Sequence, residues 1–216
     1  MKTFHRRAAV VCGLVLLCLC GLTAPVRGAA ENYWPFQVGN TWTLDTKANN
    51  TTVSMVLTVT KVTAGEGNAS DAYIEYQTDG KVMQTEIYRF DDQGISRVAD
   101  GKDAANTLSP PFPIAQYPLT DGRKWTWTGT ITTAAGQTFK GTSDLSVSGP
   151  ETVQTAAGDF KAMRVHSELA ILLPGGQKAM FPNDYWFSPG VGMVQQSAKI
   201  GETTYVGVMS SYKLQK

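Results

Sequence analysis

The chain has 216 residues, of which 42% are hydrophobic, and its 19 lysines and arginines nearly balance its 18 aspartates and glutamates. This composition is typical of a folded globular domain and excludes a disordered chain, which combines low hydrophobicity with a large net charge. The near-neutral charge also argues against nucleic acid as a partner, because nucleic-acid binding needs a clustered basic surface.

The first segment has the three parts of a secretory signal peptide. Basic residues come first, an apolar stretch follows at 8–22, and small residues begin at Gly28. The apolar stretch is shorter than the roughly 20 residues that a membrane-spanning helix needs. We therefore expect residues 1–28 to be a signal peptide, cleaved after Gly28 or after Ala30, and no transmembrane segment in the mature chain.

The cysteines point to the compartment. All three (Cys12, Cys18 and Cys20) lie in the predicted signal peptide, so the mature chain folds without disulfides. Removing residues 1–28 takes away four basic residues and no acids, which leaves 15 basic residues to 18 acidic ones. An exported chain without cysteine suits a bacterial envelope, so we expect a periplasmic or secreted protein. Lipid anchoring at Cys20 is the alternative, which the bulky Leu19 before it disfavours.

The mature chain, residues 29–216, has the two-residue periodicity of β-strands and no sustained helical stripe. Apolar and polar side chains alternate from Val53 to Thr60, and β-branched and aromatic residues fill the intervals between turn sequences. Hairpins are predicted around Asp79-Gly80, Ala134–Gly136, Pro174–Gly176 and Ile200–Glu202. A short helical turn is expected near 102–108. We predict one all-β domain, a strongly curved antiparallel sheet that forms a half-barrel or a barrel.

Two stretches of the chain resemble each other. The motif Pro35, Gly39, Trp42, Thr43 recurs as Pro118, Gly122, Trp125, Thr126, always 83 residues later. Tyr88-Arg89-Phe90 before Gly94 is matched in the same order by Tyr185-Trp186-Phe187 before Gly192. We interpret the domain as two repeats, about 31–102 and 114–216. The segment 103–113 contains three prolines without N–H donors, so we expect it to be a connector rather than a strand.

The sequence contains no recognisable catalytic set. His166 is the one histidine of the mature chain, and its place within a predicted strand favours a structural role over that of a catalytic base. One histidine without cysteine cannot supply a transition-metal site, so we expect no metal and no cofactor. Asp91–Gly94 offers oxygen ligands but lacks a calcium-binding loop, and we interpret it as an acidic turn.

Three carboxylates keep an enzymatic alternative open. Asp144, Glu168 and Asp184 would provide an acid/base pair if the fold brought two of their carboxyl groups to about 5–9 Å, as in hydrolases of glycans. Their spacing in the sequence does not by itself predict that proximity.

Aromatic residues are concentrated in the repeated motifs. If the sheet encloses an apolar cavity, the expected ligand-binding residues are Trp42, Trp125, Trp127, Tyr185, Trp186 and Phe187. Alternation along a strand places Tyr185 and Phe187 on one face and Trp186 on the other. The other interpretation is that these rings fill the core, because each buries a large apolar area.

Three sequence motifs resemble a known group of proteins. They are Tyr33-Trp34-Pro35-Phe36 with Gly39 and Trp42, the segment Glu151–Val165 with Ala157-Gly158 at its centre, and Trp186-Phe187 with Pro189-Gly190-Val191-Gly192. The chain resembles uncharacterised bacterial envelope β-proteins, which are similar to the lipoprotein carriers with a LolA-like half-barrel. That resemblance implies a curved β-sheet. The carriers also have helices over their acyl-chain cavity, and this sequence predicts none.

These observations favour an exported, non-catalytic envelope protein. We expect it to bind an apolar ligand, a lipid or acyl chain, or a protein partner through its curved sheet. A carboxylate-dependent hydrolase acting on an envelope glycan is one alternative. A structural component that assembles through exposed strand edges, with no small ligand, is the other.

Overall fold

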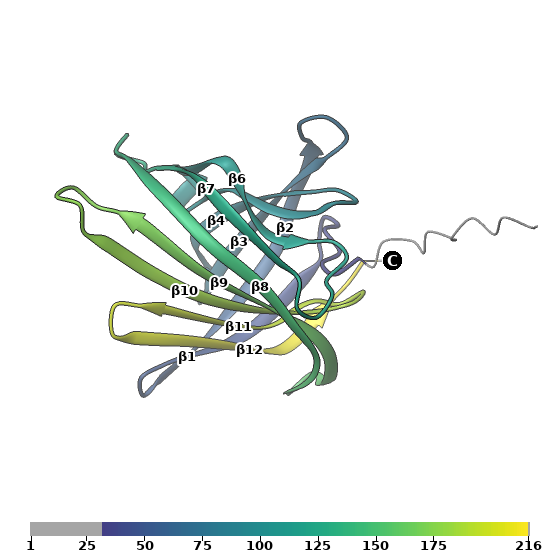
Figure 1. Cartoon of the computed structure of the whole chain (residues 1–216). Helices are drawn as coiled ribbons and strands as arrows, with labels where there is room; N and C mark the ends of the chain where they lie inside the picture. Colours follow the sequence, from purple (N-terminus) through teal and green to yellow (C-terminus); the bar gives the residue numbers. More distant parts are fainter. Residues whose placement is uncertain (1–31, 216) are drawn as a thin grey trace, which may run out of the picture.

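The computed structural model describes residues 32–215, and the predicted signal peptide with its cleavage sites and Cys20 lies outside that range. Twelve antiparallel strands form one sheet, in which each strand pairs with its neighbours in the sequence and β1 pairs with β12 (Figure 1). The predicted all-β fold with a strongly curved antiparallel sheet is therefore confirmed, and the sheet closes fully into a barrel. Closure gives every strand a neighbour on both sides.

The strands are long, and turns of a few residues join most of them. They are β1 Thr41–Ala48, β2 Thr51–Ala64, β3 Ser70–Thr78, β4 Lys81–Phe90, β5 Gly94–Asp100, β6 Asn106–Gln116, β7 Lys124–Thr132, β8 Thr138–Thr155, β9 Gly158–Leu172, β10 Lys178–Ser188, β11 Gly192–Ile200 and β12 Thr203–Lys213. A single turn of 3₁₀ helix, η1 at Lys102–Ala104, is the only helix of residues 32–215 and falls in the predicted stretch. Asp79 and Gly80 both have positive φ, as the predicted tight hairpin turn requires.

The first pair of repeated motifs forms two equivalent turns, each just before a strand. The N–H of Gly39 donates to the Val59 carbonyl at 2.8 Å, and the N–H of Gly122 donates to the Val147 carbonyl at 3.0 Å. Trp42 then lies on β1 and Trp125 on β7, and the second pair of motifs lies on β4 and β10. Each motif is therefore offset from its counterpart by six strands.

The proline-rich segment, predicted to be a connector, instead forms most of β6. Its prolines donate no ladder hydrogen bonds, and β6 pairs with β7 at only three positions, Thr107–Ser109. Two indole groups from β7 bridge the rest of this seam. Trp125 Nε1 donates to the Pro113 carbonyl at 2.9 Å, and Trp127 Nε1 donates to the Pro110 carbonyl at 3.0 Å. Tryptophan side chains of β7 thus donate to proline carbonyls of β6 where the two strands have no backbone pairing, a contact that the local sequence pattern does not predict.

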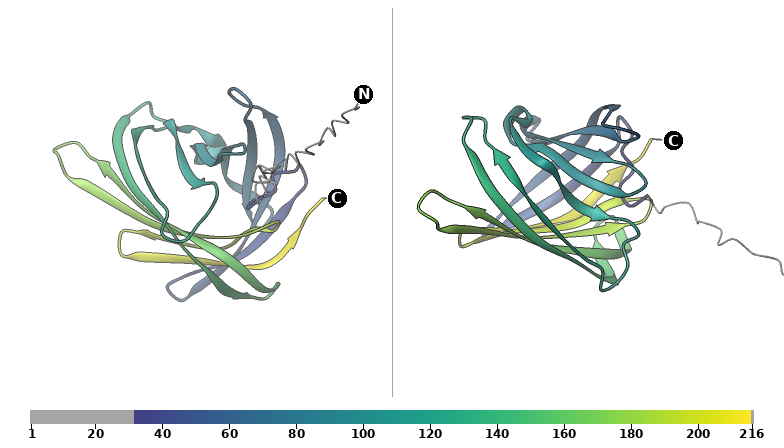
Figure 2. Two further views of the ribbon diagram at one scale, coloured as in Figure 1. Left: turned by 45° about the vertical axis from the view of Figure 1, so that its right-hand side comes forward. Right: turned by 45° about the horizontal axis from the view of Figure 1, so that its top comes forward.

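One end of the barrel is filled by an aromatic plug, which we define as Tyr33, Trp34, Phe36, Trp42, Tyr88 and Phe187. Trp34 is at its centre, with ring centroids of four other plug residues, Phe36, Trp42, Tyr88 and Phe187, between 5.0 and 5.9 Å away. All six residues are buried. The segment before β1 supplies three of them, so the chain closes its own barrel at the end where β1 begins and β12 ends (Figure 2).

Two further properties of the described chain bear on function. No helix of residues 32–215 has the length and apolar character needed to cross a membrane. The hairpin of β8 and β9 extends beyond the rest of the barrel wall at the plugged end (Figure 1). The other end, where β1–β2, β3–β4, β5–β6, β7–β8, β9–β10 and β11–β12 turn, is not closed by any described segment and holds the site described next.

Candidate functional site

The open half of the barrel contains a cavity of about 380 Å³. Its wall is mainly apolar and comes from strands β6, β7, β9, β10 and β11: Leu108, Phe112, Ile131, Leu169, Ile171, Phe181 and Ile200. A barrel of eight strands is filled by its own side chains, and twelve strands enclose a wider interior. The volume is within the range of about 300–1,000 Å³ that small-molecule sites occupy.

A group of polar side chains lies between this cavity and the plug. We call it the Arg97 cluster and define it as Tyr76, Gln84, Glu86, Tyr88, Arg97, Asp100 and Tyr185. β3 supplies the first, β4 the next three, β5 Arg97 and Asp100, and β10 Tyr185. Asn106, Asn183 and Lys199 also line the cavity, together with five of these side chains: Gln84, Glu86, Arg97, Asp100 and Tyr185.

Glu86 is the buried acceptor of the Arg97 cluster. Glu86 is only 6% exposed. Oε2 accepts hydrogen bonds from the hydroxyl of Tyr76 at 2.9 Å and from the hydroxyl of Tyr88, and Oε1 accepts one from Gln84 Nε2 at 3.1 Å. Donors of the protein therefore satisfy the hydrogen-bonding needs of this carboxylate, as a buried charge requires.

Arg97 is the cation of the cluster, with a side chain that is 17% exposed. Its Nε lies 3.6 Å from Glu86 Oε2, and its Nη1 lies 3.7 Å from Asp100 Oδ2. Its Nη2 donates to the hydroxyl of Tyr185 at 3.2 Å. Burial acts to lower the pKa of Arg97, but the surrounding Glu86, tyrosines and Asp100 together raise that pKa well above its ordinary value. Arg97 therefore stays protonated.

The tyrosines of the cluster stay neutral. Burial raises the pKa of Tyr76 and of Tyr88 well above the ordinary value, and the charge of Glu86 acts in the same direction. Burial also raises the pKa of Tyr185, although Arg97 beside it acts in the opposite direction. All three hydroxyl groups are thus available as hydrogen-bond donors at neutral pH.

These raised values predict a loss of stability in alkali. The three tyrosines ionise more easily in the unfolded chain, so their contribution to stability is complete below about pH 10 and is lost above it. Each tyrosine should lower the free energy of unfolding by about 1.4 kcal/mol per pH unit. Urea unfolding between about pH 9 and about pH 11 measures this slope. Tyr76→Phe should have the smaller slope, and an unchanged slope in that variant would contradict the assignment.

The structure separates the six aromatic residues predicted to bind a ligand. Tyr185 lines the cavity, and Phe187 stacks behind it with ring centroids 6.1 Å apart. Trp42 belongs to the plug, where its Nε1 donates to the Val191 carbonyl at 2.7 Å. Trp125 and Trp127 hold the seam between β6 and β7. Of these six residues, only Tyr185 is part of the cavity wall.

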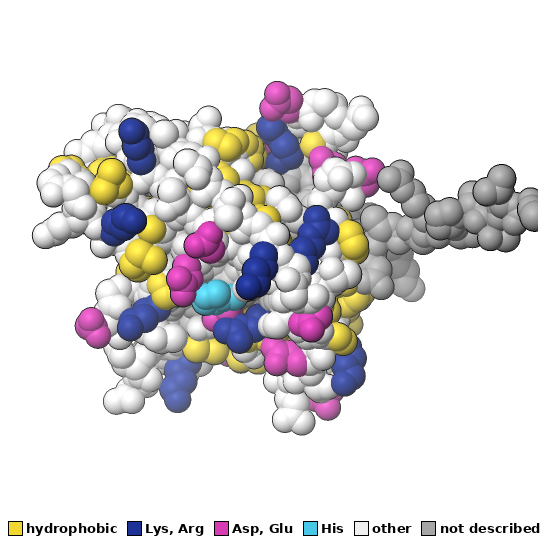
Figure 3. Space-filling view, viewed as in Figure 1, with side chains coloured by type: hydrophobic (Ala, Val, Ile, Leu, Met, Phe, Trp, Pro, Cys, Tyr) yellow, Lys and Arg dark blue, Asp and Glu magenta, His cyan; other side chains and the backbone are white. Residues whose placement is uncertain are grey.

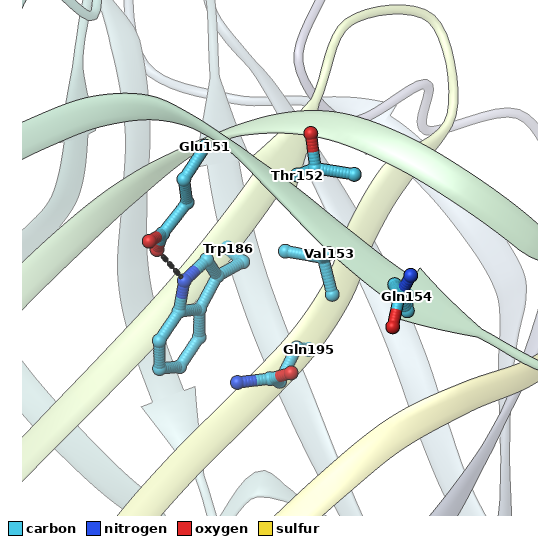
Figure 4. Close-up of a pocket in the computed structure, with 6 residues that line it drawn as sticks. All are labelled: Glu151, Thr152, Val153, Gln154, Trp186 and Gln195. Atoms are coloured by element: carbon cyan, nitrogen blue, oxygen red, sulfur yellow. Dashed lines mark hydrogen bonds between the residues drawn. The ribbon is translucent and has the colours of Figure 1, made fainter.

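Trp186 lies on the opposite face of β10 from Tyr185, as strand alternation predicts. There it lines a hollow of about 360 Å³ between the extended part of β8 and the strands β10 and β11 (Figure 4). Its Nε1 donates to the carboxylate of Glu151, and the guanidinium carbon of Arg164 lies 5.3 Å from its ring. The remaining lining is Thr152, Val153, Gln154 and Gln195, which is mostly polar. These contacts fix the β8 extension against the barrel wall.

The three carboxylates considered for hydrolysis gather on the outer surface. Asp144 on β8 is directly opposite Glu168 on β9, and Asp184 on β10 is opposite His166. His166 Nδ1 lies 2.8 Å from Asp184, which also pairs with Arg164 at 2.7 Å. Figure 3 shows the histidine among acidic and basic side chains on this open face. None of these residues lines the cavity in the barrel.

Residues 32–215 contain no group of three or more His, Cys, Asp or Glu side chains placed to hold a metal ion. The Asp91 turn predicted from sequence is present, and Asp91 Oδ1 accepts hydrogen bonds from the N–H groups of Gln93 and Gly94 at 2.8 and 3.1 Å.

The polar members of the site were missed at the sequence level. The sequence of β4 contains a sign of them: Gln84, Glu86 and Tyr88 occupy every second position and so share a face with Phe90. Polar side chains therefore point inward on this strand. Alternation alone does not say which face of a strand is inside. Arg97 is on the next strand, and only the register of β4 with β5 brings it beside Glu86.

A closed antiparallel barrel with one plugged end and one hollow end is the class that the fold and the site define. The structure is similar to a Bacteroides fragilis protein described as exported and as having a YmcC-like fold, with a TM-score of 0.57, 16% identity, and coverage of 86% of this chain and 100% of that chain. It is also similar to a Parabacteroides distasonis protein described as a lipoprotein, with a TM-score of 0.57, 12% identity, and coverage of 87% and 100%. These similarities concern the fold. No family model matches the chain, and no curated protein matches it.

Proposed function

We propose that the protein is an exported, non-catalytic binding protein of the bacterial envelope that holds a lipid-like molecule in the barrel. The observation that supports it most is the cavity itself, an apolar wall above a polar floor. A cavity of this kind suits a ligand with an alkyl chain, because burying apolar surface provides the main favourable free energy of binding. The predicted signal peptide supports export. The similar fold of two proteins described as exported and as a lipoprotein agrees with that location.

The absence of an assembled catalytic set in the cavity wall supports a binding role. The carboxylate of Glu86 already accepts hydrogen bonds from Tyr76, Tyr88 and Gln84, so it has little capacity left to take a proton from a substrate. Asp100 Oδ1 accepts a hydrogen bond from Asn106 at 3.0 Å. The single 3₁₀ turn η1 is the only helix of residues 32–215, whereas the lipoprotein carriers have helices over their cavity, so we propose reversible binding at an open mouth.

A second apolar hollow on the same molecule is an alternative binding site for the ligand. It measures about 470 Å³ on the outer side of β7 to β10, and Ala170 and Leu172 are among its lining residues. The barrel cavity is lined by Ala198 of β11 instead. Both alanines are half-buried, so one substitution at each position compares the two sites directly.

Titration with the uncharged apolar dye N-phenyl-1-naphthylamine tests the proposal. Ala198→Phe should fill part of the cavity and weaken binding by about tenfold or more. Ala170→Phe should leave the affinity unchanged. Circular dichroism establishes that both variants are folded. If Ala170→Phe loses binding and Ala198→Phe does not, the ligand binds in the outer hollow. If the wild type shows no saturable binding, the proposed function is contradicted.

A further inference from the structure

The charges that line the cavity balance one another. Glu86 and Asp100 are the two acidic lining residues, and Arg97 and Lys199 are the two basic ones. Arg97 has both carboxylates within 3.7 Å, so its charge is already compensated inside the protein. The floor of the cavity therefore presents a cation without presenting a net positive charge.

Hydrogen-bond donors nevertheless remain in excess at this floor. A guanidinium group has five N–H donors, and among residues 32–215 the hydrogen bonds of Arg97 come from Nη2 alone. Its buried Nε has no hydrogen-bond partner there, although Glu86 is nearby. Tyr185 accepts from Arg97, and its own O–H has no acceptor in the described structure. The cavity thus ends in donors that lack acceptors.

Buried donors without acceptors are costly, and a ligand that supplies an acceptor removes that cost. We propose that Arg97 and Tyr185 bind the uncharged carbonyl group of an acyl ester or amide, whose alkyl chain lies against Leu108, Leu169 and Ile171. This inference rests on the proposed function and specifies the ligand class. The carbonyl oxygen accepts from Arg97 and Tyr185, and the chain extends toward the open mouth of the barrel.

Charged head groups fit this floor less well. A carboxylate must lose its water, and Arg97 offers it little compensating charge because Glu86 and Asp100 already surround the guanidinium. An ammonium group would face the donors of Arg97 directly. Glu86 would compensate such a charge poorly, since its carboxylate already accepts three hydrogen bonds, from Tyr76, Tyr88 and Gln84. An uncharged acceptor is the remaining class.

Three probes with the same alkyl chain length test this inference: lauramide, laurate and dodecylammonium, each titrated below its micellar concentration. At neutral pH the second is anionic and the third is cationic. Calorimetry or displacement of N-phenyl-1-naphthylamine gives the three affinities for the wild-type protein. Lauramide should bind about tenfold more tightly than either charged probe.

Two tyrosine variants form a matched pair for the head-group contact. Tyr185→Phe removes a hydroxyl group that lines the cavity and should weaken lauramide binding by about three- to tenfold. Tyr76→Phe removes a hydroxyl group of the same cluster that does not line the cavity, and it should leave the affinity unchanged. Both variants keep their rings, and their thermal unfolding shows whether they are folded.

The outcomes separate the two proposals. Equal affinity for the three probes, or tighter binding of laurate or dodecylammonium, would overturn the head-group inference while the proposed function stands. Equal loss of lauramide affinity in Tyr76→Phe and Tyr185→Phe would also overturn it, because the contact would not be at the cavity. No binding of any probe would overturn the proposed function and this inference with it.

Discussion

Replacing Trp42 by alanine should lower the free energy of unfolding by about 3–5 kcal/mol. The side chain is 1% exposed and packs edge-on against Trp34 at the centre of the plug. An ideal Cβ on Gly192 would lie 2.9 Å from Trp42 Nε1, which shows how closely the backbone approaches the ring. The surroundings therefore cannot collapse into the space that alanine would leave. Equilibrium unfolding in urea measures the change.

A second substitution at the same position separates packing from hydrogen bonding. Trp42→Phe keeps an aromatic ring and removes the hydrogen bond to the Val191 carbonyl, so part of the loss should be recovered. A loss below about 1 kcal/mol for Trp42→Ala would contradict the plug as a main source of stability.

Replacing Glu86 by leucine should cost a similar amount, about 3–5 kcal/mol. In this variant Asp100 is the one carboxylate that remains near Arg97. The hydroxyl groups of Tyr76 and Tyr88 also lose their acceptor. The exposed fractions of the two side chains, 17% for Arg97 and 8% for Glu86, leave little access for water to replace the lost contacts. Removing one partner of a buried pair is more costly than removing both.

The double variant Glu86→Leu/Arg97→Met provides the control. It removes the uncompensated charge as well, so it should be more stable than Glu86→Leu alone. Unfolding of the wild type, both single variants and the double variant completes the cycle. Equal stability of Glu86→Leu and the double variant would show that Arg97 does not depend on Glu86 for its charge balance.

Much of the fold could be predicted from local patterns, because they report directly on backbone geometry. Alternation, positive-φ turn residues such as Asp79-Gly80 and the matched motifs around Trp42 and Trp125 indicate antiparallel hairpins in a curved sheet. The proline-rich strand β6 was missed, because indoles of β7 that donate to its proline carbonyls hold it in the sheet where backbone pairing is absent. That compensation depends on tertiary contact and is invisible in the segment itself.

The site was less predictable than the fold. Aromatic residues indicate burial, but the sequence does not distinguish a ring buried in the plug or the seam from one buried in the cavity wall. Only Tyr185 of the six candidates lines the cavity. The Arg97 cluster joins residues of four strands, and closure of the barrel brings Tyr185 of β10 to Arg97 of β5. Cross-barrel contacts of this kind follow from strand number and register, which a single sequence does not specify.

A crystal structure of the protein grown with lauramide tests the central claim most directly. The alkyl chain should lie in the barrel cavity beside Leu108, Leu169 and Ile171, with its carbonyl oxygen within hydrogen-bond distance of Arg97 or Tyr185. Density for the probe in the outer hollow beside Ala170, or an occupied cavity with the amide group at the open mouth and the chain end against Arg97, would contradict the account.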